Sequence, residues 1–268
     1  MKKLRADKEI TLKDFVAEKL KISKNKAKEI IDSRNVFVNN KRVWIATHTL
    51  KYGDIVEIIE TQTNLPVKVG ILYEDNYIIA VNKPANIISE NEKNSIEDIL
   101  RNQKNNKNIK AIHRLDKESS GILLFAKNFG IYERFKELWQ KKDITKIYLA
   151  ISHNEATFSN ITIREPIDGK EAVSHVKLIK KGNGFSYFEI NIETGRKHQI
   201  RKHLASIRHP IVGDKIYGVK KVENNLIKNI KRQMLHAFKL LFTHPYTDKK
   251  ISITAPIPHD FEYLLKKI

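Results

Sequence analysis

Cysteine is absent from all 268 residues of the sequence. Disulfides, thiolate nucleophiles and thiolate zinc sites are therefore excluded, and any chemistry must use carboxylate, imidazole, hydroxyl or amine groups. Long apolar runs are also missing, since none approaches the ~20 residues that a membrane-spanning helix needs. The N-terminal residues Met1–Asp7 are charged and do not form the apolar segment of a secretory signal. We therefore expect a soluble, cytoplasmic protein with no membrane partner.

Negative charge is scarce. The chain has 31 Asp and Glu residues against 50 Lys and Arg, which gives a formal net charge of +19. Such an excess indicates a polyanionic partner, most simply a nucleic acid. The alternative is a genome bias toward lysine, because lysines are spread along the whole chain. That bias explains less easily why Arg and His collect in two segments, 111–127 and 196–208.

The first sixty residues predict a small module of two helices and a few strands. Thr11 with Asp14 forms a capping-box-like pair before one apolar helical face, and Ser23 caps a second helix. A hairpin is predicted over Val36–Ile45, and a further strand over Ile55–Glu60. The second helix should expose three lysines, namely Lys24, Lys26 and Lys28.

A polar stretch that contains Pro66 predicts a linker between two domains. We expect a small domain over residues 1–62, a linker over 63–70 and a larger domain over 71–268. The larger domain contains alternating strands interrupted by few helices. This pattern predicts an α+β fold with a mixed, mostly antiparallel sheet. Within it, the basic segment Gln103–Lys110 is interpreted as a solvated loop.

One acid stands between basic side chains and a predicted buried strand. Gly121–Ala126 is a short apolar run, and His113, Arg114 and Asp116 precede it with a polar turn between. A carboxylate on a loop that is anchored to a core strand suits a reactive group. Taken alone, Asp116 also fits a turn residue that bonds its own backbone, and this ordinary interpretation is the more common one.

Two later segments carry further candidates. Alternation over Lys146–Ala150 predicts a strand that directs Tyr148 away from the face of Ile147 and Leu149, toward either a core or a site. A basic amphipathic helix is predicted over Arg196–Arg208. Its histidines at positions 198 and 203 are five residues apart, which does not match a helical zinc pair, so no metal is predicted.

The first module resembles the S-four RNA-binding domain. The resemblance rests on the L-x-x-F-V start, on Ser23–Ala27, on Val36-x-Val38-Asn39 and on Gly53-Asp54. It implies that Lys24, Lys26 and Lys28 contact RNA phosphates with little sequence discrimination. An ordinary helix-and-hairpin module with solvated lysines is the alternative.

The larger domain resembles an RNA pseudouridine synthase of the RluA type. The motifs that carry the resemblance occur in the order of that family: Val81-Asn82-Lys83-Pro84, His113-Arg114-Leu115-Asp116 with Ser119-Ser120-Gly121, Lys146-x-Tyr148-x-Ala150, Gly195-Arg196-x-His198-Gln199-Ile200-Arg201, His209-Pro210-x-x-Gly213-Asp214 and Leu235-His236-Ala237. Two places depart from the family pattern, at Ala85–Glu90 and at Glu118-Ser119. Neither includes the acid.

The resemblance implies a reaction without metal or cofactor, in which Asp116 is the essential carboxylate. It pairs Asp116 with Arg201, whose charge would favour the ionised acid. It also implies that Tyr148 stacks on the target uracil and helps to remove the proton from carbon 5. Whether the acid attacks the sugar, attacks the base or acts as a base stays open. The remaining RNA or substrate contacts that it implies are Arg114, His113, Lys83, Arg196, His198 and Ile200.

Two other function classes compete with this one. A nuclease or phosphotransferase would use His113 or His198 on RNA phosphate, but it would require paired histidines or clustered acids. A non-catalytic RNA-binding or ribosome-assembly factor would leave Asp116 structural. We expect ribosomal RNA as the substrate, with transfer RNA as the alternative. We also expect a monomer with no obligate protein partner.

Overall fold

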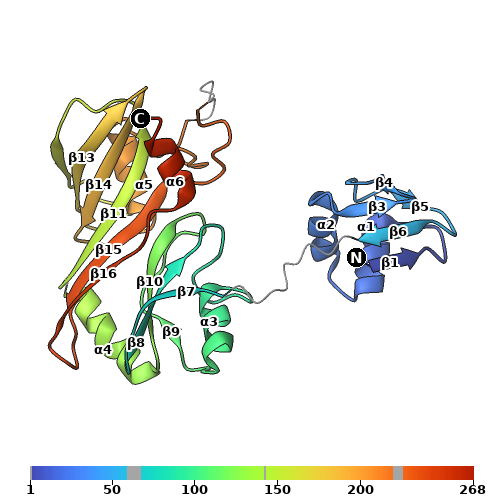
Figure 1. Cartoon of the computed structure of the whole chain (residues 1–268), viewed down its shortest axis with the longest axis horizontal. Coiled ribbons are helices and arrows are strands. Elements are labelled where there is room, and N and C mark those ends of the chain that lie inside the picture. The colour runs from blue at the N-terminus through green and yellow to red at the C-terminus, as the bar shows by residue number, and fades with distance from the viewer. Residues whose placement is uncertain (1, 59–67, 142, 220–225) are drawn as a thin grey trace. The chain divides into compact units, whose positions relative to one another are not determined.

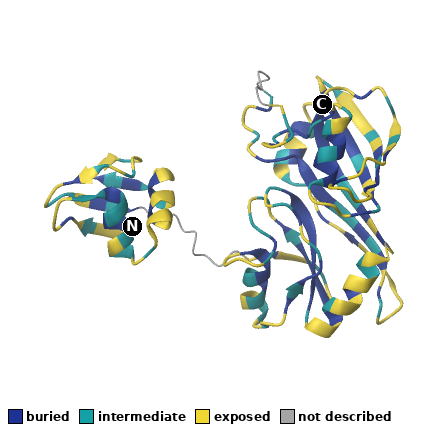
Figure 2. Cartoon of the chain, turned by 180° about the vertical axis from the view of Figure 1, so that it is seen from behind, coloured by how far each residue is buried: buried dark blue, intermediate teal, exposed yellow. Residues whose placement is uncertain are grey.

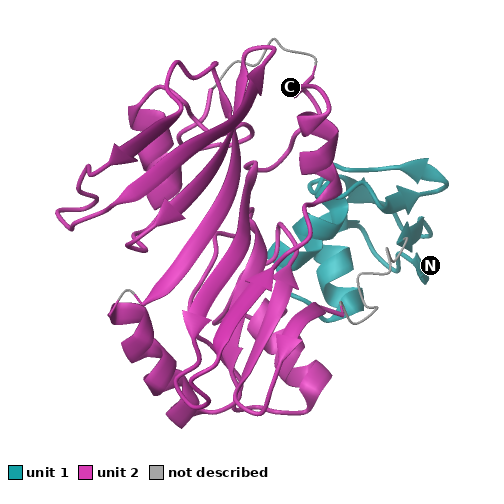
Figure 3. Cartoon of the chain, turned by 60° about the vertical axis from the view of Figure 1, so that its left-hand side comes forward, with its two compact units in different colours: residues 1–67 teal, residues 68–268 magenta. Residues whose placement is uncertain are grey.

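The computed structural model describes residues 2–58, 68–141, 143–219 and 226–268 (Figure 1). The chain divides into two compact units, Met1–Val67 and Lys68–Ile268 (Figure 3). The predicted linker 63–70 and the end of the strand predicted over Ile55–Glu60 fall mostly outside the described residues. No helix in the described ranges has both the length and the apolar character needed to cross a membrane.

The first unit contains two helices and short strands around a small apolar core. Its main sheet has the order β1-β6-β3-β4, and β2 pairs with β5. The elements are β1 (Lys2–Arg5), β2 (Ile10–Thr11), α1 (Leu12–Leu20), α2 (Lys24–Asp32), β3 (Val36–Val38), β4 (Lys41–Arg42), β5 (Thr49–Leu50) and β6 (Ile55–Ile58).

Local signals explain most of this unit. The Thr11 side chain accepts a hydrogen bond from the backbone N–H of Asp14, and Ser23 does the same for Lys26, so both predicted helix starts are confirmed. Asn39 and Asn40 both have positive φ, which lets a tight turn join β3 to β4. The second strand of the predicted hairpin is shorter than expected: β4 ends at Arg42 and does not continue to Ile45. Strand β1 was not predicted from its charged sequence.

The second unit is built on one ten-stranded sheet. Its order is β12-β13-β14-β11-β15-β10-β8-β7, with β16 beside β15 and β9 beside β10. The strands are β7 (Gly70–Glu74), β8 (Ile78–Lys83), β9 (Lys110–Ala111), β10 (Ser120–Ala126), β11 (Ile144–His153), β12 (Asn160–Ile163), β13 (Ser174–Gly182), β14 (Phe185–Ile192), β15 (Leu235–Thr243) and β16 (Lys250–Thr254). The helices are α3 (Ile96–Lys104), α4 (Phe129–Gln140), α5 (Gln199–Ser206) and α6 (His259–Leu265).

The predicted α+β class with a mostly antiparallel sheet is confirmed, since only the β10–β15 pair is parallel among the described strand pairs of this sheet. Every residue of β10 is buried (Figure 2). Ile122 and Leu124 belong to the cluster that includes Ile131 and Phe135 of α4, whereas Leu123 and Phe125 belong to the cluster that includes residues of α3. The strand that follows Asp116 is thus anchored on both faces.

Glycine is required where β10 meets β15. Gly121 has φ +110°, and a Cβ placed there would lie 2.2 Å from the carbonyl oxygen of Ala237. This close approach begins the parallel pairing of Ser120 with His236 and of Gly121 with Ala237. It therefore brings the segment before β15 beside the loop that carries Asp116.

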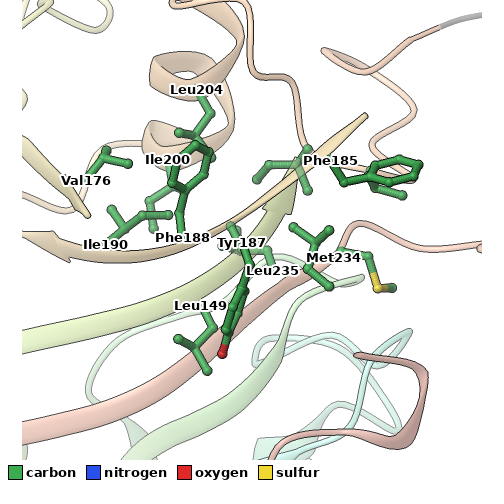
Figure 4. Close-up of a cluster of buried hydrophobic side chains, with 14 of the residues drawn as sticks. Leu149, Val176, Phe185, Tyr187, Phe188, Ile190, Ile200, Leu204, Met234 and Leu235 are labelled. Carbon is green, nitrogen blue, oxygen red and sulfur yellow. The ribbon is translucent and has the colours of Figure 1, made fainter. Parts of the chain in front are cut away.

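Helix α5 lies over the other half of the sheet. Its Ile200 and Leu204 belong to the cluster that contains Val176, Phe188 and Ile190 (Figure 4). The helix is shorter than the one predicted over Arg196–Arg208, since it begins only at Gln199. The Gln199 side chain accepts hydrogen bonds from the Arg196 backbone and the Thr194 hydroxyl, so the preceding residues form a turn.

The close contact at Gly121 leads to a stability prediction. Gly121→Ala should lower the free energy of unfolding by about 3 kcal/mol or more, because the methyl group meets backbone atoms at a positive φ. Gly169→Ala is the matched control, since Gly169 also has positive φ (+72°) but nothing within 4 Å. It should cost only about 1 kcal/mol. Urea unfolding of the three proteins measures both; equal losses would contradict the prediction.

Candidate functional site

The loop from Leu115 to Ser119 is held from several directions. The hydroxyl of Ser89 donates to the carbonyl of Leu115 at 2.9 Å and accepts from its N–H at 3.0 Å. The N–H of Ser119 donates to the carbonyl of Asp116 at 3.0 Å, which closes a tight turn. Asp116 therefore does lie in a turn, as its ordinary interpretation requires. Its side chain, however, is 30% exposed and contacts other elements.

Two cavities meet at Asp116. The smaller one, of about 100 Å³, includes Tyr148, Arg196 and Ile200 in its lining. The larger one, of about 570 Å³, includes Glu90 and Lys215. Both are lined by Arg114, Asp116, His198 and Arg201, so these four side chains border a common cleft.

Arg201 connects the exposed acid to a buried one. Its Nε and Nη2 donate to the two carboxylate oxygens of Asp214 at 2.6 and 2.8 Å. Its Nη1 donates to Asp116 Oδ2 at 2.9 Å. The side chain of Asp214 is fully buried, whereas that of Arg201 is 6% exposed. The bidentate pair fixes the plane of the guanidinium, which leaves one N–H directed at Asp116.

The electrostatics of this pair are consistent with two ionised groups. Burial alone would raise the pKa of Asp214, but hydrogen bonds from Arg201 and from the N–H groups of Ile216 and Tyr217 lower it below its usual range. The pKa of Arg201 is raised, because hydrogen bonds and charge interactions with Asp214 and Asp116 outweigh the opposing effect of burial. A buried pair of this kind loses stability strongly when one partner is removed.

Two further side chains approach the Asp116 carboxylate. Gln233 is buried, and its Nε2 lies 2.6 Å from the hydroxyl of Ser119 and 3.4 Å from Asp116 Oδ2. His198 Nε2 lies 3.8 Å from Oδ1, while its Nδ1 is 3.2 Å from the hydroxyl of Tyr217. Arg201 and Gln233 therefore both donate hydrogen bonds to Oδ2 of Asp116, whereas His198 lies near Oδ1.

Tyr148, whose strand face left open whether it enters the core or a site, lines the smaller of the two cavities. Its ring packs against two of the apolar clusters. Burial raises the pKa of Tyr148 above its usual range, and the negative charge of Asp116 adds to the rise. The hydroxyl is consequently protonated at neutral pH.

Lys83, which the sequence predicts as an RNA or substrate contact, is buried and lines neither cavity. Its side chain is fully buried, and Nζ donates to the carbonyls of Pro84, Lys117 and Ser119 at 3.0, 3.1 and 2.7 Å. Burial lowers the pKa of Lys83 to about 7, with the charge of Arg232 adding to the effect and that of Asp116 opposing it. Lys83 instead ties the end of β8 to the Asp116 loop.

His113 is also absent from the lining of both cavities, so its predicted contact with substrate is not supported. Its Nε2 accepts a hydrogen bond from the N–H of Leu124 at 3.2 Å, and its ring stacks on Trp139 with centroids 4.4 Å apart. Burial lowers the pKa of His113 to about 3, and the charge of Lys146 adds to this. A neutral imidazole in this position holds the chain beside β10.

The other predicted residues divide between the two units. Arg114, Arg196, His198 and Ile200 line the cleft, whereas Lys24, Lys26 and Lys28 are exposed on α2 of the first unit. Sequence reasoning assigned no role to Asp214, Gln233 or Ser119. Asp214 and Ser119 stand in quoted motifs, and Gln233 directly precedes Met234 and the Leu235-His236-Ala237 motif, but none of these motifs shows which side chains meet in space.

Comparison with known proteins identifies the family. Residues 77–206 match the family model described as RNA pseudouridylate synthase, a range that includes Asp116, Tyr148 and Arg201. The ribosomal large subunit pseudouridine synthase C of Buchnera aphidicola subsp. Baizongia pistaciae is 32% identical, over 90% of this chain and 87% of that protein. The chain belongs to the RluA-type family of RNA pseudouridine synthases.

Other members of the family are similarly related. The synthase D of Buchnera aphidicola subsp. Acyrthosiphon pisum is 32% identical, over 95% of this chain and 94% of that protein. The solved structure titled human RNA pseudouridylate synthase domain containing 4 shares the fold, with a TM-score of 0.63, 22% identity and coverage of 74% of this chain and 92% of that one. This pseudouridine synthase is therefore an RNA-acting isomerase, as the motifs imply.

The Arg201 pair leads to a prediction about activity. Asp214→Asn should lower the free energy of unfolding by about 3 kcal/mol and kcat by about 100-fold, because Arg201 loses the partner that aims it at Asp116. Glu97→Gln is the matched control. Buried Glu97 forms an ion pair of 2.9 Å with Arg101, and it lines neither cavity. The control should destabilise the protein without a comparable loss of kcat. Urea unfolding and single-turnover kinetics separate the two effects, and similar kcat losses would contradict the assignment.

Proposed function

We propose that this synthase isomerises uridines in ribosomal RNA and that Asp116 is its essential carboxylate. The observation that carries the proposal is the hydrogen bond of 2.9 Å from Arg201 to Asp116, at the junction of two cavities. A charged donor with a fixed plane keeps the carboxylate oriented in the cleft. A structural turn residue would not require such a partner.

The reaction rearranges a single nucleotide. The bond from N1 of uracil to C1′ of ribose breaks, the base turns, and a bond forms between C5 and C1′. The base then loses the proton on C5 and N1 gains one, so no atom is gained or lost. Carboxylate, hydroxyl and guanidinium groups supply everything that these steps need, which agrees with a chain that lacks cysteine.

The geometry suggests separate tasks for the two oxygens of Asp116. Oδ2 receives the hydrogen bonds from Arg201 and Gln233, and so Oδ1 is the oxygen that we assign to the substrate. The ring of Tyr148, in the same cavity, would stack on the uracil. Because its hydroxyl is protonated at neutral pH, Tyr148 serves as a stacking surface and hydrogen-bond donor rather than as a free base.

Arg114 suits a role toward RNA. It is exposed and borders both cavities, two residues from Asp116. Chemistry on a base within a helix requires that the nucleotide is extruded from the stack. We assign Arg114 to the phosphate or the gap of the extruded nucleotide. Arg196 and His198 line the smaller cavity together with Arg114 and would contact the same nucleotide.

Ribosomal RNA is preferred over transfer RNA for two reasons. Three relatives that match over at least 90% of this chain are named as synthases of the ribosomal large subunit. We also propose that the first unit is an S-four-like RNA-binding domain, since its sequence resembles one and α2 exposes three lysines. Its charge would add affinity for a large folded RNA. We propose that the protein works in the cytoplasm as a monomer.

A non-catalytic RNA-binding protein is the remaining alternative. It would keep the basic surface but would not need Asp116 to be oriented by Arg201. The first experiment distinguishes the two functions.

Asp116→Asn should abolish the release of tritium from RNA that carries the label at carbon 5 of uracil, because the amide can act neither as nucleophile nor as base. The substrate is total RNA from cells that lack this protein, and the assay counts tritium in water. Asp168→Asn, an exposed acid that pairs with Lys202, is the control and should retain activity. Unchanged release by Asp116→Asn, or RNA cleavage by the wild type, would refute the proposal.

The role of the first unit is tested through its lysines. Lys24→Glu with Lys28→Glu should weaken RNA binding and reduce the dependence of log Kd on log salt, since two phosphate contacts are lost. Lys2→Glu with Lys3→Glu on β1 provides a control with the same change in net charge. Fluorescence anisotropy over a series of salt concentrations measures both. Equal effects of the two double variants would show that α2 is not a specific RNA contact.

A further inference from the structure

A cluster of basic and aromatic side chains lies beyond the cleft residues. It surrounds a cavity of about 420 Å³ whose lining includes Arg101, Lys107, Asn108, Lys110, Asn128 and Phe129. Part of this lining is the basic segment interpreted above as a solvated loop. In the structure that segment is the end of α3, a turn at Asn105 and the start of β9. No acid lines the cavity in the described part of the chain.

Phe129 is the unusual member of this cluster. It is the first residue of α4 and its side chain is 62% exposed. Its ring lies 6.0 Å from that of Tyr132, with an angle of 28° between the planes. The Nζ atom of Lys110 lies 5.3 Å from the centroid of Phe129 and 4.2 Å from that of Tyr132. The result is an exposed aromatic surface beside a fixed positive charge.

We infer that this surface binds an unpaired nucleotide of the substrate RNA, outside the catalytic cleft. Phe129 would stack on the base, and Lys107 and Lys110 would contact the neighbouring phosphates. Aromatic side chains with interleaved lysines are the combination that binds single-stranded RNA with little sequence preference. The inference rests on the proposed action on RNA and names a second contact with the same molecule.

The distance between this aromatic surface and the catalytic cleft is compatible with one RNA molecule that contacts both. Strand β10 begins at Ser120, next to the Asp116 loop, and ends at Ala126, which pairs with Lys110. Six residue steps along a strand cover roughly 20 Å, the length of about six stacked nucleotides. Burial raises the pKa of Glu90 in the larger cavity and Glu97 adds to this, but the charges of Arg114 and Lys110 oppose it.

The surface should distinguish single-stranded from double-stranded RNA. In a duplex the bases are already stacked and paired, so an exposed ring has no base face to cover. Lysine contacts with phosphates, by contrast, strengthen the binding of both forms. Loss of the ring should therefore weaken the single-stranded form alone.

The experiment measures the binding of the full chain to a fluorescein-labelled 12-nucleotide oligouridylate and to a labelled duplex RNA of equal length. Phe129→Ala should raise Kd for the single strand about ten-fold, with little change for the duplex. Phe129→Tyr keeps the ring and should bind as the wild type does. Tyr263→Ala is the matched control, because Tyr263 is 53% exposed on α6 and Lys267 lies 6.0 Å from its ring.

Two results would overturn the inference. One is an unchanged Kd for the single strand in Phe129→Ala; the other is an equal loss in Tyr263→Ala or on the duplex. With tritium-labelled total RNA, Phe129→Ala should raise KM and leave kcat unchanged, since the cleft is intact. Binding is measured without turnover. Failure of the catalytic role of Asp116 would therefore appear in tritium release, separately from failure at Phe129.

Discussion

The interaction on which the site depends is the bidentate pair between Arg201 and Asp214. A guanidinium that shares two hydrogen bonds with a fully buried carboxylate cannot rotate, so the Nη1 group that donates to Asp116 keeps one direction. The backbone that carries Arg201 is also anchored, because Ile200 and Leu204 of the same helix pack against the sheet (Figure 4). Asp116 in the cleft is thereby oriented by an arginine that the core holds in place, rather than by its own loop.

Close backbone contacts at two glycines also shape the site. Gly121 allows β10 and β15 to approach closely as a parallel pair, which brings Gln233 beside Asp116. Gly213 serves a similar purpose: its φ is +77°, and a Cβ there would lie 2.0 Å from the carbonyl oxygen of Arg232. Asp214, the next residue, is consequently placed within reach of Arg201. Two glycines thus help to determine where Gln233 meets Asp116 and where Asp214 meets Arg201.

Lys83 shows that a motif does not reveal the surroundings of its residues. A lysine at a strand end in a basic protein suggests a contact with phosphate, and nothing in its neighbours indicates burial. The structure surrounds its ammonium group with the carbonyl oxygens of the adjacent Pro84 and of Lys117 and Ser119 in the Asp116 loop. Sequence patterns report which residue is present, but the surroundings of its ammonium group depend on segments more than thirty positions away.

The sequence by itself determined the class of fold through local periodicity, and it determined the family and its reaction through motifs in a definite order. It also determined the starts of α1 and α2, since capping is a contact between residues three positions apart. Tertiary structure alone decided that Asp214 orients Arg201, that His113 faces the core and that Lys110 lies against Phe129 and Tyr132. The physical reason is that side-chain directions across a sheet depend on strand register and on close backbone contacts, which join distant parts of the chain.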